Sequence, residues 1–215
     1  MIGEVILRAA SRPYGFLRGQ EWNWKVVVAR RALTAFLQQL VQQYGSIYIV
    51  ALGASAVGLG TISSLGTAVG ALIAVPSGWL VDRYSLKRVF VFGSGLAVLV
   101  PIFYIIAPDW RLIVLAMLLF SIAMRLTGTG CAVVCAESLP NEDRATGKGL
   151  CNVLASSLSL LAPTAAAFLI TAFGGMTLTG LRSLYWVQLI GYGSAFLLIA
   201  TQLREPKGLG GGEWV

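Results

Sequence analysis

The chain has 215 residues, of which 57% are hydrophobic and 12% are charged, and its mean hydropathy is +0.78. A water-soluble domain of this length needs a far more polar surface, so the composition excludes an ordinary soluble protein. Long apolar segments recur, and each has the roughly 18 residues or more that a helix needs to cross a bilayer core of about 30 Å. These segments are continuous rather than alternating, so we predict an all-α, polytopic transmembrane bundle instead of a β-barrel.

The net charge is +7, from 16 basic and 9 acidic residues. Most of the basic residues flank apolar segments, so orientation in a lipid bilayer explains them more simply than binding to nucleic acid. We therefore expect the bilayer as a partner, and no nucleic acid. The 3 cysteines lie in or beside apolar segments, with no histidine anywhere in the chain to complete a metal site. We expect them to be packing residues, and we expect no metal and no other cofactor.

Six transmembrane spans are predicted in chain order, at residues 32–53, 56–81, 89–107, 112–136, 149–173 and 183–203. Short connections such as "APDWR" and "FGGMTLTGLR" make neighbouring spans antiparallel. We expect residues 32–203 to form one bundle. A basic and aromatic cytoplasmic segment precedes it at residues 1–31, and a glycine-rich tail or start of a linker follows at residues 204–215.

The segment before the first span reads "RPYGFLRGQEWNWKVVVARR" and mixes aromatic with basic residues. This composition suits a helix in the headgroup region, where Trp and Tyr prefer to lie. A disordered basic tail that only sets topology is the alternative, and the sequence leaves both open.

The basic residues are distributed unequally between the two sides of the membrane. With a cytoplasmic N-terminus, 13 of the 16 Lys and Arg residues lie on the cytoplasmic side, while the other side has only Arg111 and Arg182. Arg125 lies inside a span. This asymmetry is a strong positive-inside signal. We predict an integral multi-pass protein of the plasma membrane, with both termini in the cytoplasm.

The stretch "SGWLVDRYSLKRVF" concentrates charge in the loop between the second and third spans. It places Gly78, Asp82, Arg83, Lys87 and Arg88 in the pattern G-x-x-x-D-R-x-x-x-K-R. The glycine allows close helix approach at the end of the second span. The aspartate can accept hydrogen bonds at the N-terminus of a neighbouring helix, where the helix dipole favours an anion. The basic side chains hold the loop at the cytoplasmic face.

In this place and order, these residues resemble the signature loop of the major facilitator superfamily of transporters. Ser85 and Leu86 stand where the usual pattern has a glycine and a basic residue. "YIVALGASAVGLG" resembles the family's join between its first two helices, and "AESLPNEDRATGKG" resembles its loop after helix four. The resemblance covers about residues 30–205 and implies the N-terminal six-helix half of the family fold. It also implies that the charged loop is a conformational latch that influences which way the cavity opens; a topology anchor is the alternative.

The first span is unusually polar. At about 100° per residue, Thr34, Gln38 and Gln42 fall along one stripe of the helix, with Gln39 beside it and Tyr48 at its edge. Polar side chains are costly in lipid, so we expect these residues to line a water-filled substrate cavity. Hydrogen bonding between helices is the alternative.

Two other spans contain residues of interest. Arg125 lies within "MRLTGTGCA" and resembles the family's span-four arginine. At this depth a guanidinium is a functional candidate for lining the cavity, by binding an anionic group or tuning a nearby protonation site. Snorkelling to the interface is the alternative. "LAPTAAAFL" resembles the family's antiporter motif without its glycines, so we expect a helix bend at Pro163 and infer little about antiport. Gly66 and Gly70 form a G-x-x-x-G packing face.

Together these features predict half of a secondary active transporter that moves a small solute by alternating access. The family's cavity lies between two six-span halves. We therefore expect a second half, supplied by homodimerisation or by a separate chain, although a fragment or a truncated gene product also fits the sequence. The rival hypothesis is a six-span assembly partner or remnant without transport activity. An enzyme is least favoured, since the sequence shows no nucleophile–base pair and no phosphate-binding loop.

Overall fold

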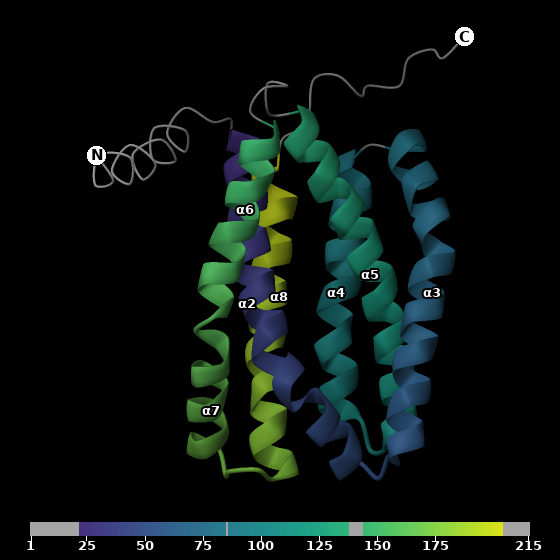
Figure 1. Ribbon diagram of the computed structural model, residues 1–215, viewed down its shortest axis with the longest axis vertical. Helices are drawn as coiled ribbons and strands as arrows, with labels where there is room; N and C mark the ends of the chain where they lie inside the picture. Colours follow the sequence, from purple (N-terminus) through teal and green to yellow (C-terminus); the bar gives the residue numbers. More distant parts are fainter. Residues whose placement is uncertain (1–21, 85, 138–143, 204–215) are drawn as a thin grey trace, which may run out of the picture.

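The computed structural model describes residues 22–84, 86–137 and 144–203, without the side chains of residues 81, 82, 86 and 129–137. In these residues its secondary structure consists of helices without strands, as predicted. The helices are α2 (Trp22–Ala51), α3 (Ala56–Arg83), α4 (Leu86–Ile106), α5 (Trp110–Glu137), α6 (Arg144–Ser159), α7 (Ala162–Ala172) and α8 (Leu178–Gln202). Figure 1 shows them side by side along the long axis, with α7 below α6 on the same side of the bundle.

Five segments of the described chain are long and apolar enough to span a membrane. They are Ala56–Leu80, Lys87–Ile106, Trp110–Gly128, Arg144–Ala172 and Leu178–Gln202. α2 is 30 residues long but is not among them. Its glutamines and basic residues lower its hydropathy, although its length matches that of the others. The structure thus confirms a multi-pass helical bundle, with α2 as its most polar member.

The first helix begins earlier than predicted. α2 starts at Trp22, so the boundary expected after residue 31 lies inside a continuous helix. The reason is burial, because Trp24, Val26 and Val27 are buried by neighbouring helices. Val26 and Val27 pack with residues of α4, α5 and α8 in one apolar cluster. This segment therefore extends the bundle and is not a separate interfacial helix from Trp22 onward.

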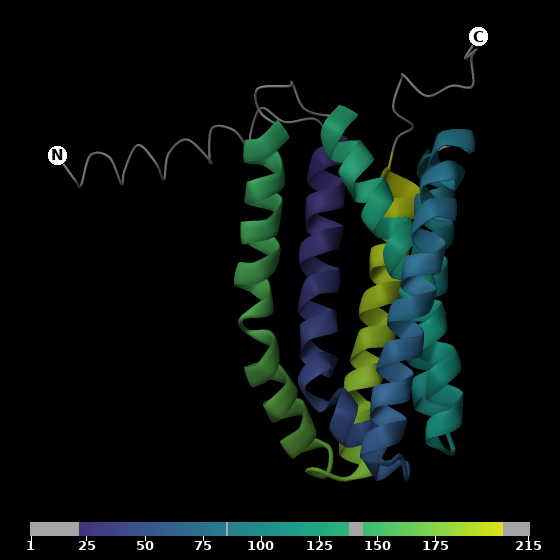
Figure 2. The same ribbon diagram turned by 45° about the vertical axis from the view of Figure 1, so that its right-hand side comes forward.

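The helices pack in two sets that α4 joins. α2 lies against α6, α7 and α8, while α3 packs mainly on α5, and α4 contacts both α5 and α8. Figures 1 and 2 show that α2 and α3 approach each other at the lower end and diverge toward the upper end. α2 and α3, which follow one another in the chain, thus belong to different sets.

Glycines allow the closest helix contacts. A Cβ added at Gly93 of α4 would lie 2.8 Å from the Leu126 Cβ and 3.1 Å from the Thr127 Cγ2 of α5. A Cβ added at Gly191 of α8 would overlap the side chain of Leu37 of α2. Close backbone approach of this kind is how membrane helices gain packing energy where lipid supplies no hydrophobic driving force.

The fifth predicted span is interrupted where a bend was expected. α6 ends at Ser159 and α7 begins at Ala162, with Pro163 in its first turn. Pro163 has no N–H to donate to the carbonyl of Ser159, and its ring would clash with that carbonyl in a continuous helix. Figure 2 shows the change of direction between α6 and α7.

Gly93→Ala should lower the free energy of unfolding by about 1–3 kcal/mol, because no side-chain rotation moves the Leu126 Cβ away from the added methyl. Gly128→Ala in α5 is the matched control, since a Cβ there meets no atom within 4 Å. The control should be neutral or stabilising by up to about 1 kcal/mol. Thermal unfolding of the detergent-solubilised protein measures both. Equal stability changes in the two variants would contradict the close contact.

Candidate functional site

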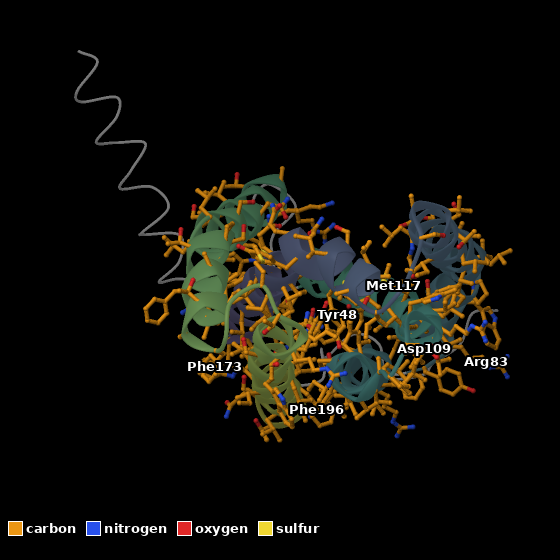
Figure 3. The ribbon with its side chains drawn as sticks, turned by 90° about the horizontal axis from the view of Figure 1, so that it is seen from below. Tyr48, Arg83, Asp109, Met117, Phe173 and Phe196 are labelled. Atoms are coloured by element: carbon orange, nitrogen blue, oxygen red, sulfur yellow. The ribbon has the colours of Figure 1, made fainter. Side chains whose placement is uncertain are left out.

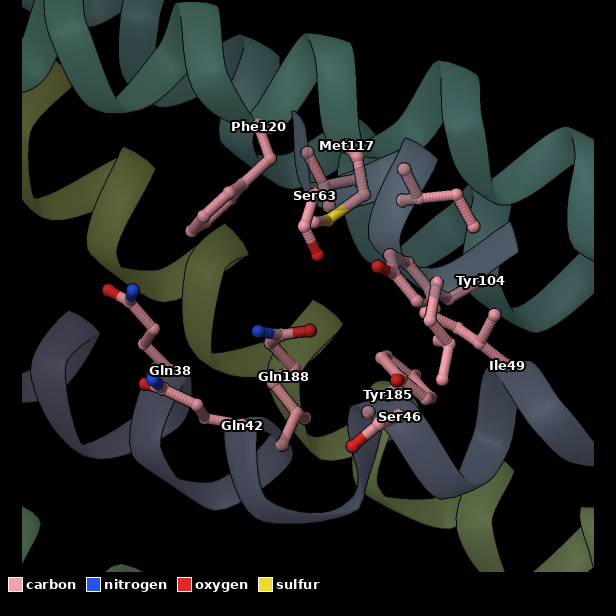
Figure 4. Close-up of a pocket in the computed structure, with 15 residues that line it drawn as sticks. Gln38, Gln42, Ser46, Ile49, Ser63, Tyr104, Met117, Phe120, Tyr185 and Gln188 are labelled. Carbon is pink, nitrogen blue, oxygen red and sulfur yellow. The ribbon is translucent and has the colours of Figure 1, made fainter. Parts of the chain in front are cut away.

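A pocket of about 410 Å³ lies among α2, α3, α4, α5 and α8 (Figure 4). Small-molecule sites are typically about 300–1,000 Å³. The lining residues are Gln38, Val41, Gln42, Gly45, Ser46 and Ile49 of α2, Leu59, Ile62 and Ser63 of α3, Val100 and Tyr104 of α4, Met117 and Phe120 of α5, and Tyr185 and Gln188 of α8. Both packing sets of the bundle therefore contribute to its wall.

Three glutamines provide much of the polar surface of the pocket. Gln38 and Gln42 come from α2, and Gln188 comes from α8 and is buried. The Gln188 Nε2 donates a hydrogen bond of 3.4 Å to the Tyr192 hydroxyl, which leaves its carboxamide oxygen for the pocket. Within the described part of the chain, the side chains of Gln38 and Gln42 have no protein hydrogen-bond partner. Figure 4 shows all three carboxamides around the same space.

Hydroxyl groups and apolar walls complete the pocket. Ser46 and Ser63 face it from α2 and α3, and Tyr104 and Tyr185 face it from α4 and α8. The two tyrosine rings stack with centroids 4.4 Å apart and planes 12° apart. No charged side chain is among the residues that line the pocket. The arrangement is suited to holding a solute by hydrogen bonds and ring contacts.

Tyr48 does not line this pocket, which corrects the prediction made for it. Its side chain is fully buried, donates a 2.6 Å hydrogen bond to the Tyr104 carbonyl and accepts one of 3.2 Å from the Arg182 Nε. The Arg182 Nη2 also donates to the Ala107 carbonyl, at 2.9 Å. We call these residues the Arg182 cluster. It joins α2, α4 and α8 at the end of the bundle seen in Figure 3, where Tyr48 lies inside the helices.

Thr34 and Gln39 also lie outside the pocket lining. The Thr34 Oγ1 donates to the Arg30 carbonyl, at 2.9 Å, so its own helix satisfies it. Gln39 is half-buried and follows Gln38 by about 100° around the helix. Of the five polar residues of α2 that were expected to line a cavity, the structure brings Gln38 and Gln42 together at this pocket. Their contact with a substrate stays a prediction.

Arg125 is not part of the pocket either. It follows Phe120, a lining residue, by five positions in α5 and is exposed. Its guanidinium lies against α3, because a Cβ added at Gly70 would be 3.4 Å from the Arg125 Nε. An anion-binding or proton-tuning role for Arg125 stays a prediction, at a place separate from the glutamines.

The glycines of α3 differ from one another in their surroundings. A Cβ added at Gly66 would lie 3.4 Å from the Ser121 Oγ of α5, so the G-x-x-x-G face does pack against a neighbour. A Cβ added at Gly78 would meet no described atom within 4 Å, and the close helix approach expected there stays a prediction. Gly78 lies near the end of α3, beyond the part of the helix where α5 comes closest.

The charged loop is described in part. Arg83 is the last residue of α3, and its guanidinium carbon lies 5.2 Å from the centroid of the Trp79 ring, a cation–π contact. Lys87 and Arg88 lie in the first turn of α4, half-buried and exposed respectively. The side chain of Asp82 lies outside the described residues. The latch role of this loop stays a prediction.

A family model described as Major Facilitator Superfamily matches residues 26–213, which is most of the chain. The chain belongs to the Major Facilitator Superfamily. The resemblance drawn from the charged loop is thereby confirmed. No curated protein matches the chain. Members of this superfamily are transporters, so the helical bundle and the family together identify a membrane protein of the transporter type.

The Arg182 cluster makes a prediction about stability. Arg182→Met should lower the free energy of unfolding by about 1–3 kcal/mol, because the buried Ala107 carbonyl loses its donor. In the double variant Arg182→Met with Tyr48→Phe, the free energy of unfolding should fall by less than the sum of the two single decreases. The difference should be about 0.5–3 kcal/mol, since the two side chains share a hydrogen bond. Arg111→Met is the control, as an exposed arginine at the same end. Thermal unfolding in detergent measures the cycle, and additive losses would contradict the coupling.

Proposed function

We propose that this chain forms one half of a secondary active transporter that moves a small solute by alternating access. The observation that supports this is the pocket, which Gln38 and Gln42 line with carboxamides that have no protein hydrogen-bond partner in the described residues. Unpaired polar groups in hydrocarbon cost several kcal/mol each, so they persist only where water or a solute reaches them. A solute pathway within a transporter family gives these groups a use.

We propose that a second six-span half, from a homodimer or a separate chain, completes the unit. Gln42 and Ser46 of α2 and Ser63 of α3 are exposed and line the pocket. Lipid would leave these groups unsatisfied, whereas a facing half would enclose them with water and polar side chains. The family architecture, with its cavity between two halves, favours the same arrangement.

We also propose that both termini lie in the cytoplasm, with the protein in the plasma membrane. The start of α2, the end of α3 and the starts of α4 and α6 lie at one end of the bundle (Figure 1). Of the 11 described basic residues, 8 lie at or near these helix ends: Lys25, Arg30, Arg31, Arg83, Lys87, Arg88, Arg144 and Lys148. The positive-inside rule assigns that end to the cytoplasm. In this orientation the charged loop from Gly78 to Arg88 acts as a cytoplasmic latch.

The assembly is tested by mass. Protein extracted from its native membrane should run as a complex of at least twice the 22.9 kDa chain, because a lone half exposes polar groups to lipid. Native mass spectrometry distinguishes a homodimer from a complex with another chain. If the extracted protein has only the mass of the monomer, the two-half proposal is contradicted. That result would favour the rival hypothesis, a six-span protein without transport of its own. A single longer polypeptide carrying both halves would replace the two-chain arrangement.

Alternating access is tested without knowing the solute. In a variant with its native cysteines replaced, Gln42→Cys should react with membrane-impermeant thiol reagents added to either side, since each side reaches the pocket in turn. Asp82→Asn should change the ratio of the two labelling rates without preventing insertion, because it removes charge but keeps shape. Asp109→Asn, in the loop at the other end, is the control. Labelling from one side only contradicts alternating access. An unchanged ratio of the two labelling rates in Asp82→Asn contradicts the latch.

A further inference from the structure

The pocket offers nothing to balance the charge of an ionic solute. All of its lining residues are neutral. Three arginines of the helices that line it make contacts outside the pocket. Arg125 lies against Gly70 of α3, Arg182 donates to Tyr48 and Ala107, and Arg30 lies over the Phe90 ring. Moving an ionised group from water into such a space is costly unless a partner of opposite charge receives it. The pocket therefore selects against anions and cations alike.

The pocket is rich in groups that both donate and accept hydrogen bonds. Each carboxamide of Gln38 and Gln42 presents an oxygen and an NH₂ group, and the hydroxyls of Ser46 and Ser63 act in either sense. None of these four side chains has a protein partner in the described residues. A solute edge that alternates donors and acceptors satisfies such a set without any charge.

Rings and aliphatic side chains form the rest of the wall. The stacked pair of Tyr104 and Tyr185 presents a flat surface at one side, and Phe120 lies with Met117 on α5. Figure 4 shows Phe120 and Met117 across the space from Gln42 and Gln188. Aromatic side chains and thioethers favour contact with the faces of other rings. A bound molecule thus meets ring surfaces on one side and hydrogen-bonding groups on the other.

From the neutrality, the hydrogen-bonding groups and the ring surfaces, we propose that the pocket binds an uncharged ring compound with a hydrogen-bonding edge and apolar faces. Neutral sugars and nucleosides share this chemistry. The inference deepens the proposed function, on which it rests for the transport step, and it assigns Gln38 and Gln42 as residues that determine specificity for uncharged solutes.

The test uses the extracted complex in nanodiscs and equilibrium dialysis of radiolabelled probes in matched pairs. Glucose is compared with glucuronate and, at pH 6, with glucosamine; uridine is compared with uridine monophosphate. In the arm that binds, the neutral member should bind at least about tenfold more tightly than its charged counterparts. The two arms distinguish a sugar from a nucleoside as the source of the ring.

Variants connect the binding to the named side chains. Gln42→Ala and Gln38→Ala should each weaken binding of the neutral probe about three- to tenfold, the worth of one neutral hydrogen bond. Gln43→Ala is the matched control, because Gln43 is the exposed neighbour of Gln42 and does not line the pocket. Ser63→Ala in α3 repeats the measurement from a different helix, so a folding defect in one variant does not decide the result.

Three results would overturn the proposal: charged members that bind as tightly as neutral ones, no binding of either neutral probe up to about 10 mM, or equal effects of Gln42→Ala and Gln43→Ala. The outcome is separable from that of the transport proposal, because cysteine labelling at position 42 needs no solute. If position 42 is labelled from both sides but charged probes bind better than neutral ones, only the proposed solute class is rejected. Neutral binding without alternating labelling keeps the solute class and rejects transport.

Discussion

Hydrocarbon offers no partner for a hydrogen bond, and this constraint decides where the polar side chains of the bundle lie. Most hydroxyls turn back onto their own helix, as Thr34 does onto Arg30 and Thr127 onto the Ala123 carbonyl, at 2.8 Å. Arg182 donates hydrogen bonds to the Tyr48 hydroxyl and the Ala107 carbonyl. Gln38 and Gln42 of α2 find no such partner in the described residues, so the pocket that they line is one place where the chain departs from this pattern.

The unpartnered polar residues make α2 less suited to lipid than the other helices. Its polar residues keep it below the hydropathy of the other spans, so it depends on neighbours for its place in the membrane. Those neighbours hold it by close packing, since Gly191 of α8 leaves room for Leu37, and by the Arg182 cluster through Tyr48. Leu37 and Leu40 on one face of this helix are buried, whereas Gln42 on the opposite face is exposed.

The sequence predicts the features that depend on local patterns. Hydropathy locates the helices, and the helical period places Gln38 and Gln42 on one stripe, where the structure has them. Tyr48 lies at the edge of the same stripe but bonds with Tyr104 and Arg182, and helical period alone cannot show contacts so distant in the chain. Gln188 was missed, although a glutamine within an apolar span is a signal of the same kind that singled out α2. The interruption before α7 follows from a proline, but its position depends on packing.

The pocket lies where the two packing sets of the bundle meet. Gln38 and Gln42 belong to the set of α2 and α8, whereas Ser63 and Phe120 belong to the pair α3 and α5. A molecule bound there makes contacts with both sets, so its binding free energy depends on their relative position. A ligand shifts a conformational equilibrium only by its difference in affinity between the two states. A solute in the pocket would contact residues of both sets. Through these residues its binding can shift the equilibrium between conformations of the bundle.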